Sequence, residues 1–312
     1  MIPVTPIVTN RPSELATDIS ERHNTKSLRL FSAPEAAELL GVSGQFMRKV
    51  HGEGTLPEPQ EIRAGRRYYT ARDIWNARQI LEQTSRKKGR YLPGRRDGDN
   101  LQVWQLMNFK GGSSKSTTTI HLAHFLALQG YKVLAVDLDP QGSLTSMCGI
   151  SPEIEFDGLT VYDAIRYDDP VPFADTIVET YFPGLSLAPS RLLLSEFETE
   201  SAVNSSPDQP FFTRIRSALA QVEDQYDVVL MDSPPQLGFL TIAGMAAASS
   251  LIVPLTPSML DVSSTAQFLE LAGAYMGVIE DAGATLQYDQ FKFLITRDEP
   301  TDIPAQQLTS FM

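Results

Sequence analysis

A ten-residue loop, residues 108–117, joins an apolar segment directly to a helix-forming segment, and few folds accommodate that arrangement. The loop reads Asn-Phe-Lys-Gly-Gly-Ser-Ser-Lys-Ser-Thr. Small residues before a helix leave backbone N–H groups and the positive end of the helix dipole open to an anion, which is how proteins cradle phosphate. The loop therefore predicts a phosphate-binding turn between a buried strand and a helix.

Strand-like and helix-like segments alternate from residue 101 onward. We expect strands at 101–108, 132–137, 226–232, 251–255 and 291–296, and helices at 115–128, 211–222, 238–248 and 258–280. The strands are continuous apolar runs of the kind that parallel sheets bury on both faces. This order predicts an α/β fold with a doubly wound, mostly parallel sheet.

The lysine spacing separates this loop from the common phosphate-binding pattern. The pattern G-x-x-x-x-G-K-[ST] fails at its two glycine positions, which Phe109 and Ser114 occupy. The sequence instead fits K-G-G-x-x-K-[ST], with Lys110 as an extra lysine before the two glycines and Lys115 as the usual lysine of the pattern. On these residues the chain resembles the ParA/MinD group of P-loop ATPases, from about Gln102 to the C-terminus.

Two further segments resemble this group, in the same order along the chain. Ala135–Gly142 contains D-x-D-P-Q, and Asp227–Pro235 contains an apolar strand followed by D-x-P-P. Each lies at the carboxyl end of a predicted strand, which is the edge where such sheets bind ligands. The resemblance implies ATP hydrolysis as the activity and ATP and Mg²⁺ as cofactors.

Chemistry and the resemblance together assign roles around the loop. Lys115 is a point charge for the β- and γ-phosphates, and the Ser116 hydroxyl is a hard oxygen ligand for Mg²⁺, which Asp232 orients through water. Thr296 and Arg297, at the end of the last strand, are candidates for contact with the base. The expected nucleotide-binding residues are Lys110, Gly111, Gly112, Ser113, Ser114, Lys115, Ser116 and Thr117.

Phosphoryl transfer needs a neutralised γ-phosphate and a water aligned behind it. By resemblance Asp139 aligns that water, and Asp137 supports the metal shell, although a structural capping role for Asp137 stays open. Lys110 resembles the signature lysine that reaches the partner's nucleotide in an ATP-bridged homodimer. The expected catalytic residues are Lys110, Lys115 and Asp139, and the expected metal site comprises Ser116, Asp137 and Asp232.

Charge is divided unequally along the chain. Residues 1–96 carry 17 Lys and Arg against 10 acidic residues, and residues 97–312 carry 9 against 28. The first part therefore favours a polyanion such as nucleic acid. A single cysteine, Cys148, excludes an internal disulfide and an iron–sulfur cluster, and with the cluster a nitrogenase-type reductase. We expect a reducing, cytoplasmic setting and no membrane helix.

Residues 31–83 have the pattern of two short helices, a hairpin and a third helix. Ser32 and Pro34 mark the start of the first helix, Gly41 its end, and Ser43 the cap of the second helix. This is the helix-turn-helix plan, in which the second helix enters the major groove. The residues expected on the exposed face of that helix are Gln45, Arg48, Lys49 and His51.

An arginine-rich hairpin, residues 61–70, follows the two helices. Arg67-Tyr68-Tyr69 and Asp73 resemble the end of the wing and the start of the next helix in MerR-type winged helices. The second helix would face base edges or phosphates, and the hairpin would neutralise the DNA backbone. The expected DNA-binding residues are Gln45, Arg48, Lys49, Arg63, Arg66 and Arg67.

We therefore expect four regions. They are an N-terminal extension at 1–30, a winged helix-turn-helix domain at 31–83, a basic linker at 84–100 and the P-loop ATPase domain at 101–312. The linker is expected to be a solvated tether or a phosphate contact. The family continues beyond the last predicted strand, so this chain is expected to be shortened at its C-terminus, which favours operator binding over nucleoid binding.

Fusion of a winged helix to such an ATPase is closest to the RepA partition proteins of repABC-type plasmids. The resemblance implies a nucleoid-associated homodimer that segregates plasmids with a ParB-like partner, represses its own operon through operator DNA, and can bind non-specific nucleoid DNA but no membrane. The alternative is a MerR-like transcriptional regulator whose ATP-binding domain senses ATP without hydrolysing it. Phosphate release with and without DNA and partner separates the two.

Overall fold

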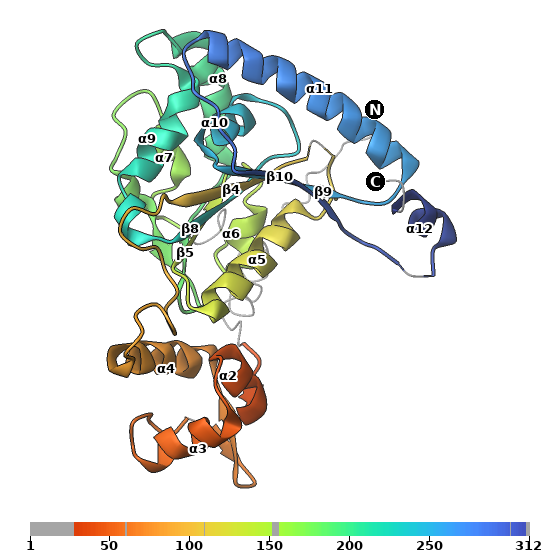
Figure 1. The fold of residues 1–312 in the computed structure, drawn as a ribbon. Helices are drawn as coiled ribbons and strands as arrows, with labels where there is room; N and C mark the ends of the chain where they lie inside the picture. The colour runs from red at the N-terminus through yellow and green to blue at the C-terminus, as the bar shows by residue number, and fades with distance from the viewer. Residues whose placement is uncertain (1–27, 60, 109, 152–155, 300, 310–312) are drawn as a thin grey trace, which may run out of the picture.

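The computed structural model describes residues 28–59, 61–108, 110–151, 156–299 and 301–309. The extension predicted for residues 1–30 lies outside the described residues except for its last three. The described chain forms a small N-terminal unit, residues 28–84, and a larger α/β unit, residues 101–309, joined by residues 85–100 (Figure 1).

A seven-stranded sheet forms the centre of the larger unit. Its strand order is β10-β9-β4-β8-β5-β7-β6, and every neighbouring pair is parallel except β6 with β7. The doubly wound, mostly parallel sheet predicted from the sequence is therefore confirmed. The strands are β4 (Gln102–Leu106), β5 (Val133–Asp137), β6 (Val178–Glu179), β7 (Leu185–Ala188), β8 (Val228–Asp232), β9 (Ser250–Leu255) and β10 (Gln290–Ile295).

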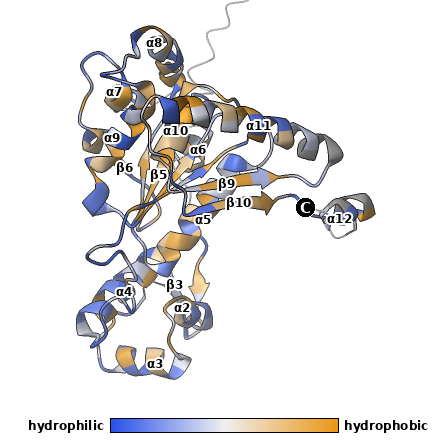
Figure 2. Cartoon of the chain, turned by 45° about the horizontal axis from the view of Figure 1, so that its top comes forward, coloured by the Kyte–Doolittle hydropathy of each residue, from blue (hydrophilic) through white to orange (hydrophobic). Residues whose placement is uncertain are grey.

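Helices cover both faces of this sheet, because its central strands are apolar on both sides. In β5, Leu134 and Val136 pack toward α7, α9 and α10, whereas Val133 and Ala135 pack toward α5 and α6. Figure 2 shows the apolar residues concentrated in these strands. The helices are α5 (Lys115–Gln129), α6 (Ser143–Met147), α7 (Val161–Ile165), α8 (Glu196–Asn204), α9 (Arg214–Ala220), α10 (Phe239–Ala247), α11 (Met259–Asp281) and α12 (Ile303–Thr309).

The N-terminal unit consists of three helices and a small antiparallel sheet of order β1-β3-β2. The Ser43 hydroxyl accepts the N–H of Phe46 at 3.1 Å and so caps α3. Ala64 and Gly65 both have positive φ, as a two-residue hairpin turn between twisted strands requires. The elements are β1 (Phe31–Ser32), α2 (Ala33–Leu39), α3 (Gly44–Gly52), β2 (Glu61–Arg63), β3 (Arg66–Tyr69) and α4 (Ala71–Thr84).

His51 does not lie on the exposed face of α3, contrary to the sequence prediction. Met47 lies four residues before it on the same helix face, Val50 directly precedes it, and all three are buried. The Nε2 atom of His51 lies 2.9 Å from the Tyr69 hydroxyl of β3. His51 therefore joins α3 to the hairpin and is not available to DNA.

Residues 85–100 are not a solvated tether, so this part of the linker prediction is wrong. The Tyr91 side chain is buried in a hydrophobic cluster that extends from the N-terminal unit into α5 of the larger unit. Farther along, the Arg95 N–H donates to the Asp227 carboxylate at 2.7 Å, and its guanidinium Nε donates to the Tyr226 carbonyl at 3.0 Å. The segment is therefore anchored to both units.

Arg78 of α4 connects three segments through one buried guanidinium. It donates to the carbonyls of Leu128 at 3.0 Å, Tyr91 at 2.8 Å and Leu39. Leu39 ends α2 and Leu128 lies in the last turn of α5, so the cation lies at two helix C-termini, where the helix dipole favours positive charge. Burial lowers the pKa of Arg78 to about 10, which leaves it charged at neutral pH.

Arg78→Met is expected to lower the free energy of unfolding by about 3 kcal/mol, because it leaves one buried and two partly buried carbonyls without their donor. Urea unfolding can be followed separately in each unit, since Trp75 lies in α4 and Trp104 in β4. Trp75→Phe leaves Trp104 to report on the larger unit, and Trp104→Phe leaves Trp75 to report on the N-terminal unit. We expect the two unfolding transitions to coincide while Arg78 is present and to separate after Arg78→Met. Arg72→Met, an exposed position on the same helix, should change stability by less than about 0.5 kcal/mol. Equal effects at the two arginines would contradict this role.

Candidate active site and DNA-binding surface

The candidate active site lies at the carboxyl ends of three adjacent strands. In the sheet register, Asp232 at the end of β8 is paired with Leu106 of β4 on one side and Asp137 of β5 on the other. The loop that follows β4 leads into α5 at this same edge. The topology therefore brings together the three segments that the sequence analysis selected.

Asn108, which the sequence analysis did not single out, anchors the start of the loop. Its side-chain amide donates to the carbonyl of Pro254 in β9 at 2.8 Å, and its amide oxygen accepts the N–H of Lys110 at 3.0 Å. The Asn108 side chain is buried. It therefore fixes the backbone from which Lys110 projects.

The end of the loop adopts a left-handed backbone conformation. Gly112 has φ +79° and Ser114 has φ +69°, and the carbonyl of Ser114 accepts the first hydrogen bond of α5, from Thr118 at 2.8 Å. A serine in this conformation carries a steric cost of about 1–2 kcal/mol that glycine avoids. The chain thus keeps the glycine-type geometry at position 114 without a glycine.

Lys115 lies inside the loop that it ends. It is buried, and its Nζ lies 3.3 Å from the carbonyl of Lys110, which places the ammonium across the mouth of the loop. Burial lowers the pKa of Lys115, and the charges of Asp232 and Asp139 oppose this effect. The ammonium is therefore held among acceptors that a phosphate group could replace.

Asp232 is fully buried beside the first turn of α5. Its Oδ1 lies 3.5 Å from the Thr119 hydroxyl, and burial raises the pKa of this carboxyl against the smaller, opposite effect of the nearby Ser116 side chain. Its Oδ2 has no hydrogen-bond partner among the described residues. A buried carboxylate oxygen without a donor is costly, and a divalent cation is a ligand that would satisfy it.

Asp137 and Asp139 have different surroundings although they are two residues apart. Asp137 accepts the N–H and hydroxyl of Thr145 at 2.8 and 2.7 Å and the N–H of Asp139 at 3.1 Å. Asp139 accepts the N–H of Gln141 at 2.9 Å through one oxygen. Asp137 thus has the contacts of a structural residue that holds α6 and the Asp139 loop, and Asp139 retains an oxygen for chemistry.

Negative charge exceeds positive charge in this site. Burial raises the pKa of Asp137, Asp139 and Asp232, and their mutual repulsion adds to the effect for Asp137 and Asp232. The buried ammonium of Lys115 interacts with two of these three carboxylates, Asp139 and Asp232. A divalent cation would relieve the imbalance and favour the ionised carboxylates.

Thr296 lies against the loop, whereas Arg297 is exposed. The Thr296 hydroxyl lies 3.3 Å from the Ser113 carbonyl and 3.2 Å from the Leu255 carbonyl, so it joins the end of β10 to the loop. Arg297 has φ +54° and an exposed side chain. Thr296 is therefore a support for the loop backbone, and a contact of either residue with a base stays a prediction.

Ser114→Gly is expected to raise turnover, because it removes a Cβ at a left-handed position where the backbone must lie close to phosphate. The matched variant is Ser114→Ala, which keeps the Cβ and the strain while it removes the hydroxyl. Steady-state phosphate release should rank Gly above Ser, with Ala close to Ser. A glycine variant slower than the parent chain would contradict this interpretation of the loop.

The predicted DNA-binding side chains fall into two groups. Gln45, Arg48 and Arg66 are exposed and form no ion pair with a described residue. Arg67 makes two hydrogen bonds of 2.7 Å to Glu58, and Lys49 lies 3.7 Å from Glu53. Arg67 therefore supports the hairpin, and the first group is the better candidate for DNA contact.

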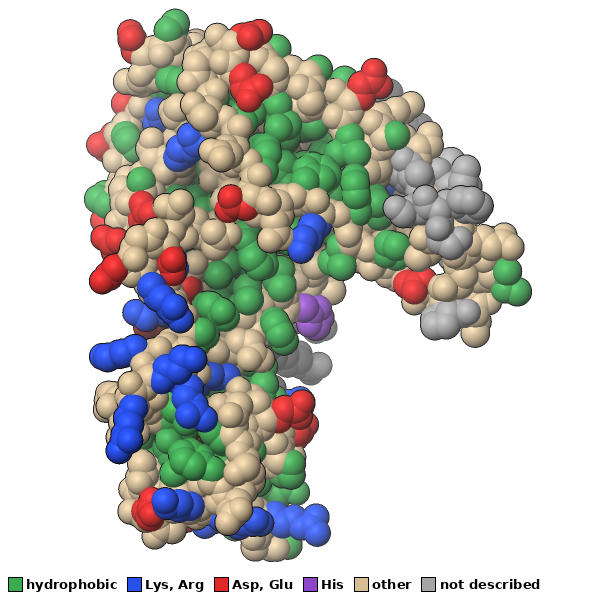
Figure 3. All heavy atoms as spheres, viewed as in Figure 1, with side chains coloured by type: hydrophobic (Ala, Val, Ile, Leu, Met, Phe, Trp, Pro, Cys, Tyr) green, Lys and Arg blue, Asp and Glu red, His purple; other side chains and the backbone are tan. Residues whose placement is uncertain are grey.

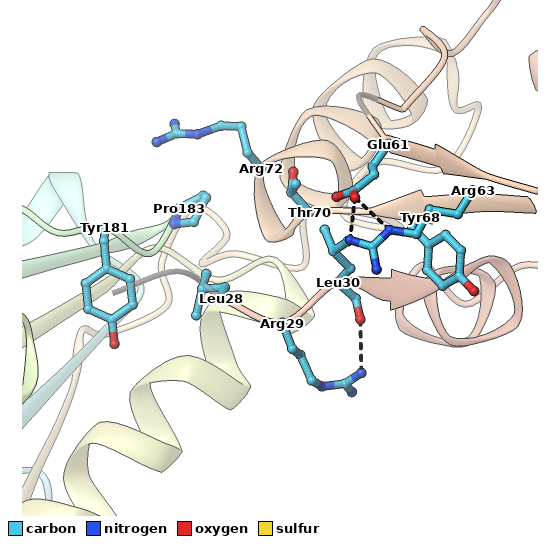
Figure 4. A pocket seen from close by; sticks show the side chains of 10 residues that line it. All are labelled: Leu28, Arg29, Leu30, Glu61, Arg63, Tyr68, Thr70, Arg72, Tyr181 and Pro183. Carbon is cyan, nitrogen blue, oxygen red and sulfur yellow. Dashed lines mark hydrogen bonds and ion pairs between the residues drawn. The ribbon is translucent and has the colours of Figure 1, made fainter. Parts of the chain in front are cut away.

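Arg63 is likewise engaged within the N-terminal unit. Its guanidinium bonds the Glu61 carboxylate, as Figure 4 shows, and lies over the Tyr68 ring at 5.8 Å. These residues line a groove of about 740 Å³ between the hairpin and the loop around Tyr181 and Pro183 of the larger unit. Arg63 thus helps to form the wall of this groove.

Comparison with known proteins places the chain in a family. A model described as an AAA domain matches residues 101–276. A protein named as a replication protein A from Sinorhizobium fredii is 46% identical over 294 residues, which cover 92% of this chain and 72% of that protein. Protein SopA of Escherichia coli strain K12 is 34% identical and covers 79% and 63%. The chain belongs to the ParA-type partition ATPases.

A solved structure that contains a bound nucleotide analogue is similar to this partition ATPase. Cobyrinic acid a,c-diamide synthase from Mycobacterium smegmatis, solved with an ATP analogue and magnesium, is 30% identical, covers 68% of this chain and 81% of its own, and has a TM-score of 0.58. Within the part of the partition ATPase that the structure describes, no helix has both the length and the hydrophobicity needed to span a bilayer.

Proposed function

We propose that this chain binds ATP and Mg²⁺ at residues 110–117 and hydrolyses ATP as a homodimer to drive plasmid partition. Lys115 would neutralise the β- and γ-phosphates, Ser116 and Asp232 would hold the metal ion, and Asp139 would orient the attacking water. When bound, Mg²⁺ supplies charge neutralisation at the phosphate oxygens. The observation that carries this proposal is the convergence of Lys115, Asp139 and Asp232 on one loop.

The residues fit the metal and the nucleotide on their own chemistry. The unpartnered Oδ2 of Asp232 and the Ser116 hydroxyl are hard oxygen donors at the helix N-terminus. The relative with an ATP analogue and magnesium shows that this fold accepts both ligands. Asp137, with hydrogen bonds to both of its oxygens, would support Asp139 and need not touch the ion.

The dimer would place two nucleotides between two copies of the chain. Lys110 is exposed on the loop and Asn108 fixes its backbone, which suits a lysine that reaches the partner copy. A ParB-like centromere-binding protein would stimulate hydrolysis, and association with nucleoid DNA would locate the complex. Phosphate release by the purified chain, with and without DNA and partner, tests this. Nucleotide binding without hydrolysis under all conditions would favour the ATP-sensing regulator instead.

The N-terminal unit would bind operator DNA through α3 and the hairpin, and so repress the operon that encodes the chain. Gln45, Arg48 and Arg66 would make contacts, because their side chains are exposed and carry no internal ion pair. Arg67 and Arg63 would act mainly by shaping the hairpin. A DNase footprint on the upstream region of the operon tests this assignment, and no protected site would contradict it.

Arg48→Ala is expected to weaken operator binding by about 1–3 kcal/mol if Arg48 contacts a base, with relaxed specificity at one position. If Arg48 contacts phosphate, affinity should fall uniformly for all sequences with a shallower salt dependence. Fluorescence anisotropy with operator and shuffled duplexes measures both. Lys49→Ala, whose lysine lies beside Glu53, serves as the control and should have a smaller effect. If Arg48→Ala binds the operator as tightly as the parent chain, the proposed position of α3 in the major groove is wrong.

A further inference from the structure

A turn after α4 carries four cations within five residues. Arg86, Lys87, Lys88 and Arg90, named here the basic turn, are all exposed. None of the four forms an ion pair with a described residue. The guanidinium of Arg90 lies 5.3 Å from the centroid of the Tyr91 ring. The basic turn therefore presents an uncompensated positive surface.

The acidic groups near the basic turn face its backbone rather than its side chains. The Glu82 carboxylate accepts the N–H groups of Gly89 at 2.6 Å, Tyr91 at 2.8 Å and Leu92 at 3.3 Å. Asp227 likewise accepts the N–H of Arg95. Glu82 therefore holds the backbone of the basic turn, Asp227 holds the chain that follows it, and the four cations stay exposed.

Four surface cations of the N-terminal unit are compensated by neighbouring carboxylates, whereas Arg48 and Arg66 resemble the basic turn in having no ion pair with a described residue. Arg29, Lys49, Arg63 and Arg67 each lie beside a glutamate of the same unit. Four like charges on an anchored turn repel one another, and this repulsion destabilises the folded state unless an anion is bound. The chain as a whole has a net charge of −12, so general basicity does not account for the cluster.

We propose that the basic turn binds the sugar–phosphate backbone of duplex DNA without reading its sequence. No apolar side chain is exposed with the cations, since Tyr91 is buried and Leu92 half-buried, so the turn lacks the apolar groups that membrane insertion or a protein interface core requires. Figure 3 shows Lys and Arg gathered where the two units meet, beside the acidic rim of the larger unit. The proposal rests on the proposed DNA binding by the N-terminal unit.

The test measures the salt dependence of binding to a random 30-base-pair duplex by the full chain. Each phosphate contact contributes about 0.9 to the slope of log K against log salt, so R86Q/K87Q/K88Q/R90Q should reduce the slope by about 3 to 4 and weaken binding by tenfold or more in low salt. K88Q should reduce the slope by about 1. The matched control K292Q removes one exposed lysine of β10 and should leave the slope unchanged.

Three outcomes would overturn the proposal. The first is an unchanged salt slope in the quadruple variant, and the second is an equal reduction of the slope in K88Q and K292Q. The third comes from a parallel measurement with phosphatidylserine vesicles: the quadruple variant loses vesicle binding while its DNA binding is intact. Tryptophan fluorescence confirms folding of each variant. On the same samples we measure phosphate release and the preference of the quadruple variant for operator over shuffled duplex. These two measurements separate failure of the proposal for the basic turn from failure of the proposed ATPase activity or operator binding.

Discussion

Lys115→Ala is expected to abolish ATP hydrolysis, with a loss of at least about 10²–10³-fold in turnover. The Lys115 ammonium lies across the loop, 3.3 Å from the Lys110 carbonyl, and it is the buried cation that faces Asp139 and Asp232. A preorganised charge in a buried site contributes more to the transition state than the same charge in water. Phosphate release under saturating ATP measures the effect.

ATP binding should also weaken in Lys115→Ala, because the ammonium would contact the phosphates before and during phosphoryl transfer. Fluorescence of a labelled ATP analogue gives the dissociation constant, which should rise by at least about tenfold. Lys132→Ala removes an exposed lysine at the opposite edge of the sheet, before β5, and should leave both quantities unchanged. Parent-like turnover after Lys115→Ala would refute the assignment of the loop.

Asp139→Ala is expected to reduce turnover by about 10²–10⁴-fold while ATP binding stays largely intact. Asp139 holds the N–H of Gln141 with one oxygen, and the other has no hydrogen-bond partner among the described residues. Its carboxylate therefore has an oxygen with which to orient a water, and its truncation leaves the contact between the Lys115 ammonium and the Lys110 carbonyl in place. Single-turnover phosphate release and nucleotide binding, measured together, give the separation.

Asp137→Ala provides the contrast. Asp137 holds Thr145 and the Asp139 backbone, so its truncation should lower the free energy of unfolding by about 2 kcal/mol or more and should impair turnover through misplacement of Asp139. Asp139→Ala should have a free energy of unfolding close to that of the parent chain. If Asp139→Ala loses ATP binding as fully as turnover, Asp139 is a binding residue and its assignment to the water is wrong.

The sheet and the phosphate-binding loop could be predicted from the sequence for physical reasons. Apolar runs such as β5 are buried on both faces, so their residues report the sheet directly, and the lysine and glycine spacing reports the loop. The short elements between residues 160 and 205 were missed. Strands of two to four residues such as β6 and β7 carry too few residues for a periodic pattern.

The contacts that support the site could not be found by pattern. Asn108 and Thr145 act through hydrogen bonds to backbone or carboxylate groups that only the fold brings near. The prediction for His51 is wrong because a polar residue on a basic helix suggests exposure, whereas its four-residue spacing from Met47 places it on the buried face. Arg78 resembled any arginine of an amphipathic helix, and its partners lie 13 to 50 residues away.

The Arg78 guanidinium has a geometric consequence for DNA. Because it fastens the ends of α2 and α5, the N-terminal units cannot swing freely, and two associated copies would hold them at one separation. Dimeric helix-turn-helix proteins contact half-sites at helical-turn spacings. A few base pairs inserted between the half-sites should therefore weaken binding by the proposed dimer. A longer segment between the two units of the chain would not restore binding while Arg78 keeps its hydrogen bonds.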